Sequence, residues 1–442
     1  MRSMMFVCLL GCGGGSNSPD AVSGNRPDPR VIPGGGIGDG PIDGLVNLYV
    51  IDDASRTAIA EAEVSVGTVT GTTDATGLFV AEGVIGPQDV LVKASPYRPD
   101  LLIGVNGANV TVNLELANLA AAPSATLSGS IPSLVATALP ANHSIIATVA
   151  YSQTVALGDP ANDIAQAVVG GVPQNLCAAT LALDPCNFTI TSRTGKVALV
   201  ARLIDNDSKG TPTPTDDTQV FVGWAVLQGL AVAAGTNQTG LTLTKLAANT
   251  LQTVVVDFGA PPAELTTRIG IVGIEIGDEG LLPLEFVASA SPTLQAPKLT
   301  AVAGATGYRL TGFSTDSAPT DPRQSIVLRR ALPGPALAAG SWIDPPTDVT
   351  LSRAGGAWSN AAGGTIHTVG ITLGGTRLLN VVVLDSSRTT FTVPSQITLP
   401  SGSLAAAVNA IAAPGLDVSD FEGDRDEATF DRVSVQAATI AP

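Results

Sequence analysis

The sequence has little of what enzymes use for catalysis. Its 442 residues include only two histidines, four cysteines and three tryptophans, and aromatic residues make up 4% of the chain. His143 and His367 cannot form a His-rich metal site, and they leave little basis for a His-dependent catalytic triad. No Gly-x-Ser-x-Gly motif provides the nucleophile elbow of a hydrolase. We therefore expect a noncatalytic protein without a cofactor.

Basic residues are scarce as well. The chain has 22 Lys and Arg residues against 38 Asp and Glu residues, which gives a formal net charge of −16. Such a chain repels a polyanion, so we expect no nucleic-acid partner. No segment beyond the N-terminus reaches the run of about 18 apolar residues that a transmembrane helix needs.

The chain is rich in small apolar residues and in residues that form turns. Hydrophobic residues make up 45% of it, and it contains 48 glycines and 31 prolines. This composition favours many short strands joined by turns over long helices rich in Lys and Glu. The sequence predicts an all-β fold of about three or four domains, arranged as tandem β-sandwich modules.

The N-terminus has the pattern of an export signal. Arg2 precedes the apolar run Met4–Leu10, which ends at Gly11 and Cys12. The pattern resembles the signal of a bacterial lipoprotein, with Leu9–Cys12 as the lipobox. The resemblance implies that residues 1–11 are removed and that diacylglycerol is attached to the thiol of Cys12. The alternative is an ordinary apolar N-terminus that begins a strand.

The residues after the lipobox refine this interpretation. Gly13–Pro19 cannot continue a strand or a helix, which favours cleavage before Cys12. Gly13 stands where an Asp would retain the protein at the inner membrane, so the resemblance implies an outer-membrane lipoprotein of a Gram-negative bacterium. Residues 12–43 have no apolar periodicity and predict a flexible tether that spans on the order of 30 Å.

Residues 44–116 predict a first module. Apolar residues alternate along Val46–Val50 and again along Ala62–Val66, as in half-buried strands. The stretch resembles the carboxypeptidase regulatory-like domain, a transthyretin-like β-sandwich. The resemblance implies that Asp74 and Gly77 form a structural turn, with Asp74 accepting backbone N–H groups and Gly77 adopting a positive φ.

Residues 121–258 predict a second sandwich, which contains the two cysteines that remain after export. In an oxidising envelope Cys177 and Cys186 should pair, closing a loop of about ten residues and contributing about 2–3 kcal/mol. The alternative is two free thiols. Their spacing does not fit a CxxC redox or zinc motif.

One loop of this module has the composition of a calcium site. Asp205 and Asp207 are followed by Asp216 and Asp217, and hard cations bind several oxygen ligands at alternating positions. Lys209 stands where a further oxygen ligand belongs. A solvated turn is therefore the favoured interpretation over a metal site.

The remaining residues predict a β-rich module or connector at 259–335 and a final sandwich at 336–442. The final one resembles a fibronectin type III domain through Trp342, Trp358 and the segments Leu378–Leu384 and Phe391–Pro394. The two tryptophans either stack on a sugar or fill the core, and core filling is favoured. Leu404–Ala413 is rich in Ala, but its surroundings predict a strand.

Three classes of function are compatible with these observations. The favoured one is a noncatalytic, lipid-anchored protein of the cell envelope, whose sandwiches act as spacers and bind protein or carbohydrate at the cell surface. A second is an accessory subunit of a secretion or surface complex, which presents strand edges to a partner. A hydrolase that uses an Asp/Glu pair at about 5–10 Å is the least favoured.

Overall fold

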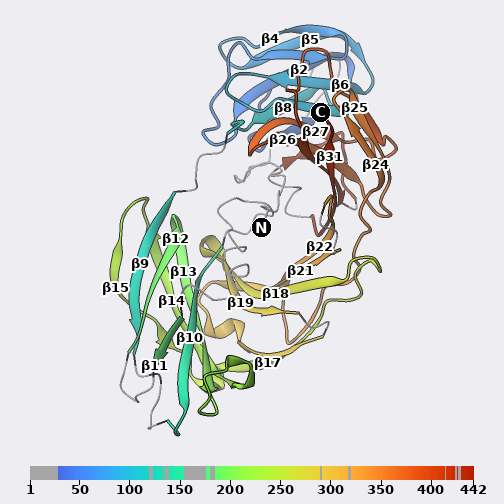
Figure 1. The fold of residues 1–442 in the computed structure, drawn as a ribbon. Coiled ribbons are helices and arrows are strands. Elements are labelled where there is room, and N and C mark those ends of the chain that lie inside the picture. The colour runs from blue at the N-terminus through green and yellow to red at the C-terminus, as the bar shows by residue number, and fades with distance from the viewer. Residues whose placement is uncertain are drawn as a thin grey trace.

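The computed structural model describes residues 28–118, 123–132, 134, 139–153, 176–179, 185–288, 291–316, 320–413, 415–423, 426 and 430–442. Strands dominate this part of the chain, so the expected all-β class is confirmed. Sheets pack in pairs as tandem β-sandwiches, which follow one another along a curved path (Figure 1). Short 3-10 turns join some strands, namely η1 (Pro214–Asp216), η2 (Ala248–Thr250), η3 (Gly277–Glu279) and η4 (Leu299–Ala301).

One long sheet joins distant parts of the sequence. In the order of pairing, its twelve strands are β19 (Gly280–Val287), β18 (Thr267–Ile276), β21 (Ala305–Thr315), β22 (Arg323–Leu332), β31 (Arg432–Ile440), β29 (Leu404–Ala412), β26 (Ile366–Leu373), β27 (Thr376–Val383), β7 (Asp100–Val105), β6 (Gln88–Lys93), β3 (Glu63–Val66) and β4 (Val69–Thr72). The parallel pairing of β7 with β27 sets Leu101 opposite Val381. Strands from the two ends of the sequence therefore lie side by side (Figure 1).

The N-terminal sandwich packs a second sheet against β3, β4, β6 and β7. This sheet has the order β30 (Phe421–Glu422), β1 (Gly36–Gly38), β8 (Asn109–Leu114), β2 (Asp43–Asp52) and β5 (Leu78–Ile85). The alternating Val46 and Leu48 point into its core, as period-two patterning predicts. Ile366, Ile411 and Phe421 lie in the same core. Residues 44–116 thus share their core with the C-terminal part of the chain.

The segment before β2 differs from the flexible tether that the sequence predicts for residues 12–43. Ile32, Ile37 and Ile42 are buried, and β1 pairs with both β8 and β30. Glycines are compatible with this arrangement, because a Cβ on Gly36 would lie 2.0 Å from the carbonyl oxygen of Phe421. The described residues of the segment are therefore part of the sandwich.

The distal sandwich lies at the opposite end of the molecule from the N-terminal sandwich (Figure 1). One of its sheets has the order β11 (Leu176–Ala179), β10 (His143–Tyr151), β13 (Gly195–Asp207), β14 (Thr218–Val232) and β16 (Thr244–Lys245). The other has the order β12 (Cys186–Arg193), β9 (Ser124–Ile131) and β15 (Gln238–Thr242). Leu127, Val149 and Leu199 meet in its core.

The middle sandwich covers β18, β19, β21 and β22 with a sheet of order β20 (Thr293–Pro297), β17 (Leu251–Asp257) and β23 (Ala336–Ala338). Val256 pairs with Leu337 in parallel, so this sandwich extends across both ends of the range 259–335 expected for a separate module. Its core includes Trp224 and Val200 from the distal sandwich. The two sandwiches are therefore joined by shared packing.

The C-terminal sandwich packs β26, β27, β29 and β31 against a sheet of order β24 (Thr347–Ser352), β25 (Gly355–Ser359) and β28 (Thr390–Thr392). The strand expected at Leu404–Ala413 is confirmed as β29. Trp342 and Trp358 are 9% and 4% exposed, so they fill cores and offer no platform for a sugar.

Candidate functional site

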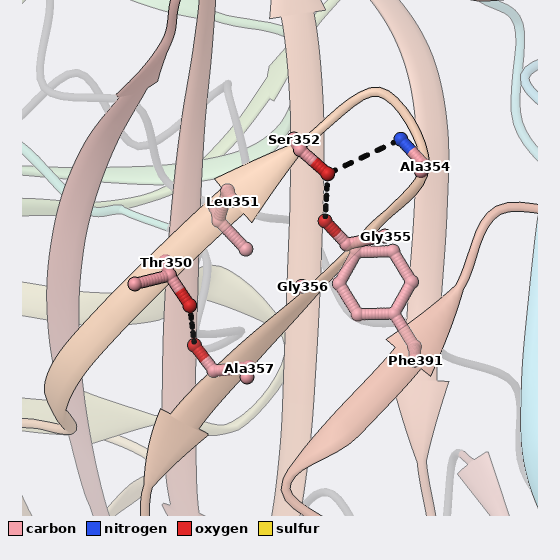
Figure 2. Close-up of a pocket in the computed structure, with 8 residues that line it drawn as sticks. All are labelled: Thr350, Leu351, Ser352, Ala354, Gly355, Gly356, Ala357 and Phe391. Atoms are coloured by element: carbon pink, nitrogen blue, oxygen red, sulfur yellow. Dashed lines mark hydrogen bonds between the residues drawn. The ribbon is translucent and has the colours of Figure 1, made fainter.

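A shallow pocket of about 350 Å³ lies in the C-terminal sandwich, on the hairpin of β24 and β25. Figure 2 shows the hairpin residues grouped around the ring of Phe391, which comes from β28. The pocket is lined by Thr350, Leu351, Ser352, Ala354, Gly355, Gly356, Ala357 and Phe391.

The polar groups of this pocket are already used within the hairpin. Ser352 Oγ donates to the carbonyl of Gly355 at 3.1 Å and accepts the N–H of Ala354 at 3.3 Å (Figure 2). Thr350 Oγ1 donates to the carbonyl of Ala357 at 3.4 Å. None of the lining residues is charged. The pocket therefore offers an apolar surface to a small group, and its lining has no charged or imidazole group that could activate the two hydroxyls.

Two of the four calcium candidates lie at the end of β13 and have local partners. Asp205 Oδ1 lies 2.9 Å from Nδ1 of His143. Asp207 accepts the backbone N–H of Lys209 at 2.9 Å and the Lys209 ammonium at 2.5 Å. The hydrogen bond from the Lys209 side chain is the largest effect that lowers the pKa of Asp207. Lys209 thus supplies the positive charge beside this carboxylate.

The other two candidates point to different partners. Asp216 accepts Oγ1 of Thr211 at 2.8 Å, and Asp217 accepts Nδ2 of Asn206 at 2.8 Å. Asn206 lies between Asp205 and Asp207 on β13, so its side chain points to the opposite face of the strand. Within the described ranges, no three His, Cys, Asp or Glu side chains form a group that could hold a metal ion. The structure does not bring the four aspartates together.

The cysteines are only partly described. Cys12 lies outside the described residues. Cys186 is fully buried at the start of β12 and is disulfide-bonded, whereas the side chain of Cys177 in β11 lies outside the described part. The strands β11 and β12 contact each other from the two sheets of the distal sandwich. The pairing of Cys177 with Cys186 stays a prediction.

Asp74 and Gly77 form a tight turn before β5. Asp74 Oδ1 accepts the N–H groups of Thr76 at 2.8 Å and Leu78 at 3.0 Å. These bonds and the Thr76 hydroxyl, the largest contributor, lower the pKa of Asp74. Gly77 has a φ of 76°, and a Cβ there would lie 2.7 Å from the carbonyl oxygen of Val50. The geometry of this turn is that of a structural element without reacting groups.

Sequence reasoning missed a buried histidine. His367 in β26 is 0% exposed, and neither of its ring nitrogens has a hydrogen-bond partner among the described residues. Its ring lies 5.5 Å from that of Trp358, centroid to centroid. Burial lowers the pKa of His367 to about 4, so the imidazole is neutral at pH 7. The period-two pattern of β26 could have shown that this position is inward, but not that it lacks partners.

A buried ionic cluster joins the N-terminal and C-terminal sandwiches. Arg98 Nε lies 3.2 Å from Oδ1 of Asp100, and Arg98 Nη1 lies 3.5 Å from Oε2 of Glu115. Arg377, at the start of β27, pairs with the same carboxylate of Glu115. Burial raises the pKa of Asp100 to about 6, against the opposing effect of Arg98. The cluster lies where β7 pairs with β27, so it connects the two sandwiches at this junction.

None of the helices in the described part of the chain has both the length and the apolar character needed to cross a membrane.

Comparisons with known proteins identify no family. No family model matches the sequence, and no curated protein matches it. Among solved structures, the Bacillus anthracis TIE protein shares 9% identity at a TM-score of 0.13, covering 67% of this chain and 49% of its own. The chain thus spans about half the length of that protein.

Two further solved structures have similarly low scores. A tetra-tandem repeat from the extending region of a large adhesion protein shares 11% identity at a TM-score of 0.14, covering 90% of this chain and 98% of its own. E. coli alpha-2-macroglobulin shares 11% identity at a TM-score of 0.11, and the match covers 90% of this chain and 28% of that protein. These likenesses assign the chain to no family, and its function must be inferred from its own residues.

Proposed function

We propose that the protein is a noncatalytic, lipid-anchored component of an outer membrane, whose fused sandwiches hold a binding surface at a distance from the lipid. The anchor is the diacylglyceryl group on Cys12, and the ligand is a protein or a carbohydrate at the cell surface. The resemblance of residues 44–116 to the carboxypeptidase regulatory-like domain belongs to the same proposal, as a structural module without peptidase activity.

The observation that carries the proposal is the route of the chain. Described residues begin at the N-terminal sandwich, continue through the distal, middle and C-terminal sandwiches and return to the N-terminal sandwich at β30. The distal sandwich therefore lies at the opposite end of the molecule from the sandwich that contains the first described residues (Figure 1). This geometry suits a spacer with a binding unit at its tip.

The junction between the distal and middle sandwiches supports a stiff spacer. Arg193 donates to the carbonyl of Glu279 at 2.7 Å, and the backbones of Gln153 and Leu281 exchange two hydrogen bonds of 2.7 Å. The indole of Trp224, from the distal sandwich, lies in the core of the middle one. A junction with shared core and backbone pairing resists bending better than a linker does.

The anchor is tested by metabolic labelling with a fatty acid and by detergent-phase partitioning of the full chain. Cys12→Ala should abolish the labelling and move the protein to the aqueous phase, because no other described or predicted feature attaches it to lipid. Cys8→Ala is the matched control and should keep both properties. Unchanged labelling of Cys12→Ala would refute the lipid anchor.

Purification from detergent-solubilised envelopes separates the spacer from the accessory-subunit alternative. A partner recovered in equal molar amount with the anchored protein would favour a subunit of a surface complex. Recovery of the protein alone would favour adhesion if, in addition, intact wild-type cells bind surface ligands and cells that carry Cys12→Ala do not.

A further inference from the structure

The N-terminal segment Asp28–Gly38, here called the strap, covers a row of buried polar side chains on the outer face of the N-terminal sandwich. The row consists of Asn47 on β2 and of Asn109, Thr111 and Asn113 on β8, all at most 2% exposed. Asn and Thr are uncommon in such buried positions unless they have hydrogen-bond partners. The strap supplies several of these partners.

The contacts of the strap are specific and mostly polar. Thr111 Oγ1 accepts the N–H of Ile32 at 2.9 Å, and Nδ2 of Asn109 donates to the carbonyl of Asp28 at 3.2 Å. Oδ1 of Asn109 accepts the N–H of Arg30 at 3.4 Å. The amide of Asn47 donates to the same oxygen of Asn109 at 3.0 Å. The row therefore recognises the backbone of this segment by its hydrogen-bonding pattern.

The end of the strap forms β1 in a slot between two strands. Ile37 pairs with Val110 on β8 and with Phe421 on β30, and it is 1% exposed in the core. The backbone N–H of Gly423 donates to the carbonyl of Gly35 at 2.9 Å. One wall of the slot thus comes from a part of the chain that follows β8 by about 300 residues.

Two features favour exchange of this segment between molecules. The pairing of β1 with β30 joins residues about 385 positions apart, so it closes a much longer loop than the pairing of β1 with β8 and costs more entropy to form. Only four residues, Asp39–Ile42, join the strap to β2. They cross over β8, which lies between β1 and β2 in the sheet. Asp39 in this crossing has a φ of 57°, in the sparsely populated left-handed region. A short connection of this kind favours exchange of a terminal element between copies.

We propose that two copies of the chain exchange their straps, so that Asp28–Gly38 of each occupies the slot and polar row of the other. The second copy is the favoured occupant because its strap has the same sequence and satisfies the same hydrogen bonds. No new interface chemistry is needed, since each contact within one chain is replaced by the identical contact between chains. The inference does not depend on the lipid anchor.

The test uses full-length chain with Cys8→Ser and Cys12→Ala, refolded over a range of protein concentrations. A disulfide is introduced across the slot with Ile37→Cys and Val110→Cys, which stand opposite each other. In an exchanged dimer this bond links two chains, so a band of twice the chain mass should appear on a nonreducing gel. Its share should rise with the concentration at refolding and persist after dilution.

A matched pair of cysteines controls for nonspecific cross-linking. Val64→Cys and Val92→Cys also replace paired, buried residues on antiparallel strands of the same core, away from the strap. This pair should form its bond within one chain at every concentration. Dimer bands of equal strength in both variants would overturn the proposal.

A second variant keeps the test decisive if the slot disulfide impairs folding. Deleting Gly40 and Pro41 shortens the crossing, so the strap can no longer reach the slot of its own chain. The exchange model predicts that this variant is a stable dimer by light scattering, with the strap protected from proteolysis. A folded monomer with a strap that is cleaved rapidly would overturn the model, because it would show that the slot does not accept the segment from another copy.

Discussion

The buried imidazole of His367 should make the protein sensitive to acid in a narrow pH range. In the folded state its pKa is about 4, whereas the ordinary value is 6.5. The unfolded chain therefore binds a proton more readily than the folded chain does. The contribution of His367 to the free energy of unfolding is therefore highest above pH 6.5 and falls as the pH drops towards 4.

The magnitude follows from the difference between the two pKa values. At 1.36 kcal/mol per pH unit, a fully developed effect reaches about 3 kcal/mol. At pH 5 the same linkage gives about 2 kcal/mol. For a domain with a typical stability of about 5–15 kcal/mol this is a large loss.

The perturbation that isolates this effect is His367→Leu, which keeps an apolar side chain in the core and removes both ring nitrogens. Because neither nitrogen has a hydrogen-bond partner among the described residues, their removal relieves a desolvation penalty of about 1–3 kcal/mol and offsets the loss of the contact with Trp358. We expect the stability of the variant at pH 7.5 to be close to that of the wild type.

The assay is urea unfolding followed by circular dichroism at pH 7.5, 6, 5 and 4.5. Between pH 7.5 and 5 the wild type should lose about 2 kcal/mol more than His367→Leu. His143→Gln, which removes the other histidine, is the control for the loss of an imidazole elsewhere in the chain. Equal pH dependence in the wild type and His367→Leu would refute a buried, neutral His367.

Three further predictions concern other described features. Burial raises the pKa of Asp100 to about 6, so ionisation of this carboxyl should lower the stability of the folded chain as the pH rises from about 4 to about 6. Asp100→Asn should remove this loss. Urea unfolding of both proteins at pH 4 and 7 measures the difference, expected at about 3 kcal/mol or less. Nonreducing peptide mapping should recover Cys177 and Cys186 as one linked pair, and Cys177→Ser should lower the melting temperature; two alkylated thiols would contradict this. Millimolar calcium should leave the melting temperature within a degree of that in chelator, since Asp205 and Asp207 already have cationic or hydrogen-bonding partners; a rise of several degrees that disappears in the double Asn variant would show a calcium site.

Local patterns in the sequence predicted the strands well. Alternation along Val46–Val50 and Ala62–Val66 corresponds to β2 and β3, and the β-rich surroundings correctly predicted β29 in spite of its alanines. Such patterns report on burial of one face, which depends mainly on neighbouring residues. They do not report which strand pairs with which.

Long-range pairing could not be read from the sequence. Leu91 and Val92 on β6 are neighbours, yet Val92 faces the core of the N-terminal sandwich and Leu91 faces that of the C-terminal one. Such a strand, with cores on both faces, reads as a continuous apolar run without a preferred partner. The pairing of β7 with β27 depends on residues about 280 positions apart, for which no local signal exists.

The candidate sites show the same limit. The Asp205–Asp217 region has ligand-type residues, but the sequence cannot show that Lys209 and Asn206 already bind two of the carboxylates. Glycines before β2 predicted a tether because they lack apolar periodicity. In the structure, Gly36 lies where two strands approach closely, so composition alone predicted a tether where the chain forms β1.

The pairing of β1 with β30 joins the first described strand to the C-terminal part of the chain, and it determines how the molecule responds to tension. A force applied between the described ends, near Asp28 and Pro442, first acts on β1, β31 and their neighbours. Because β31 also pairs with β22, the same force reaches the middle sandwich, whereas the described strands β9 to β16 pair only with one another and lie off this path. The distal sandwich would therefore keep its shape under forces that already strain the opposite end.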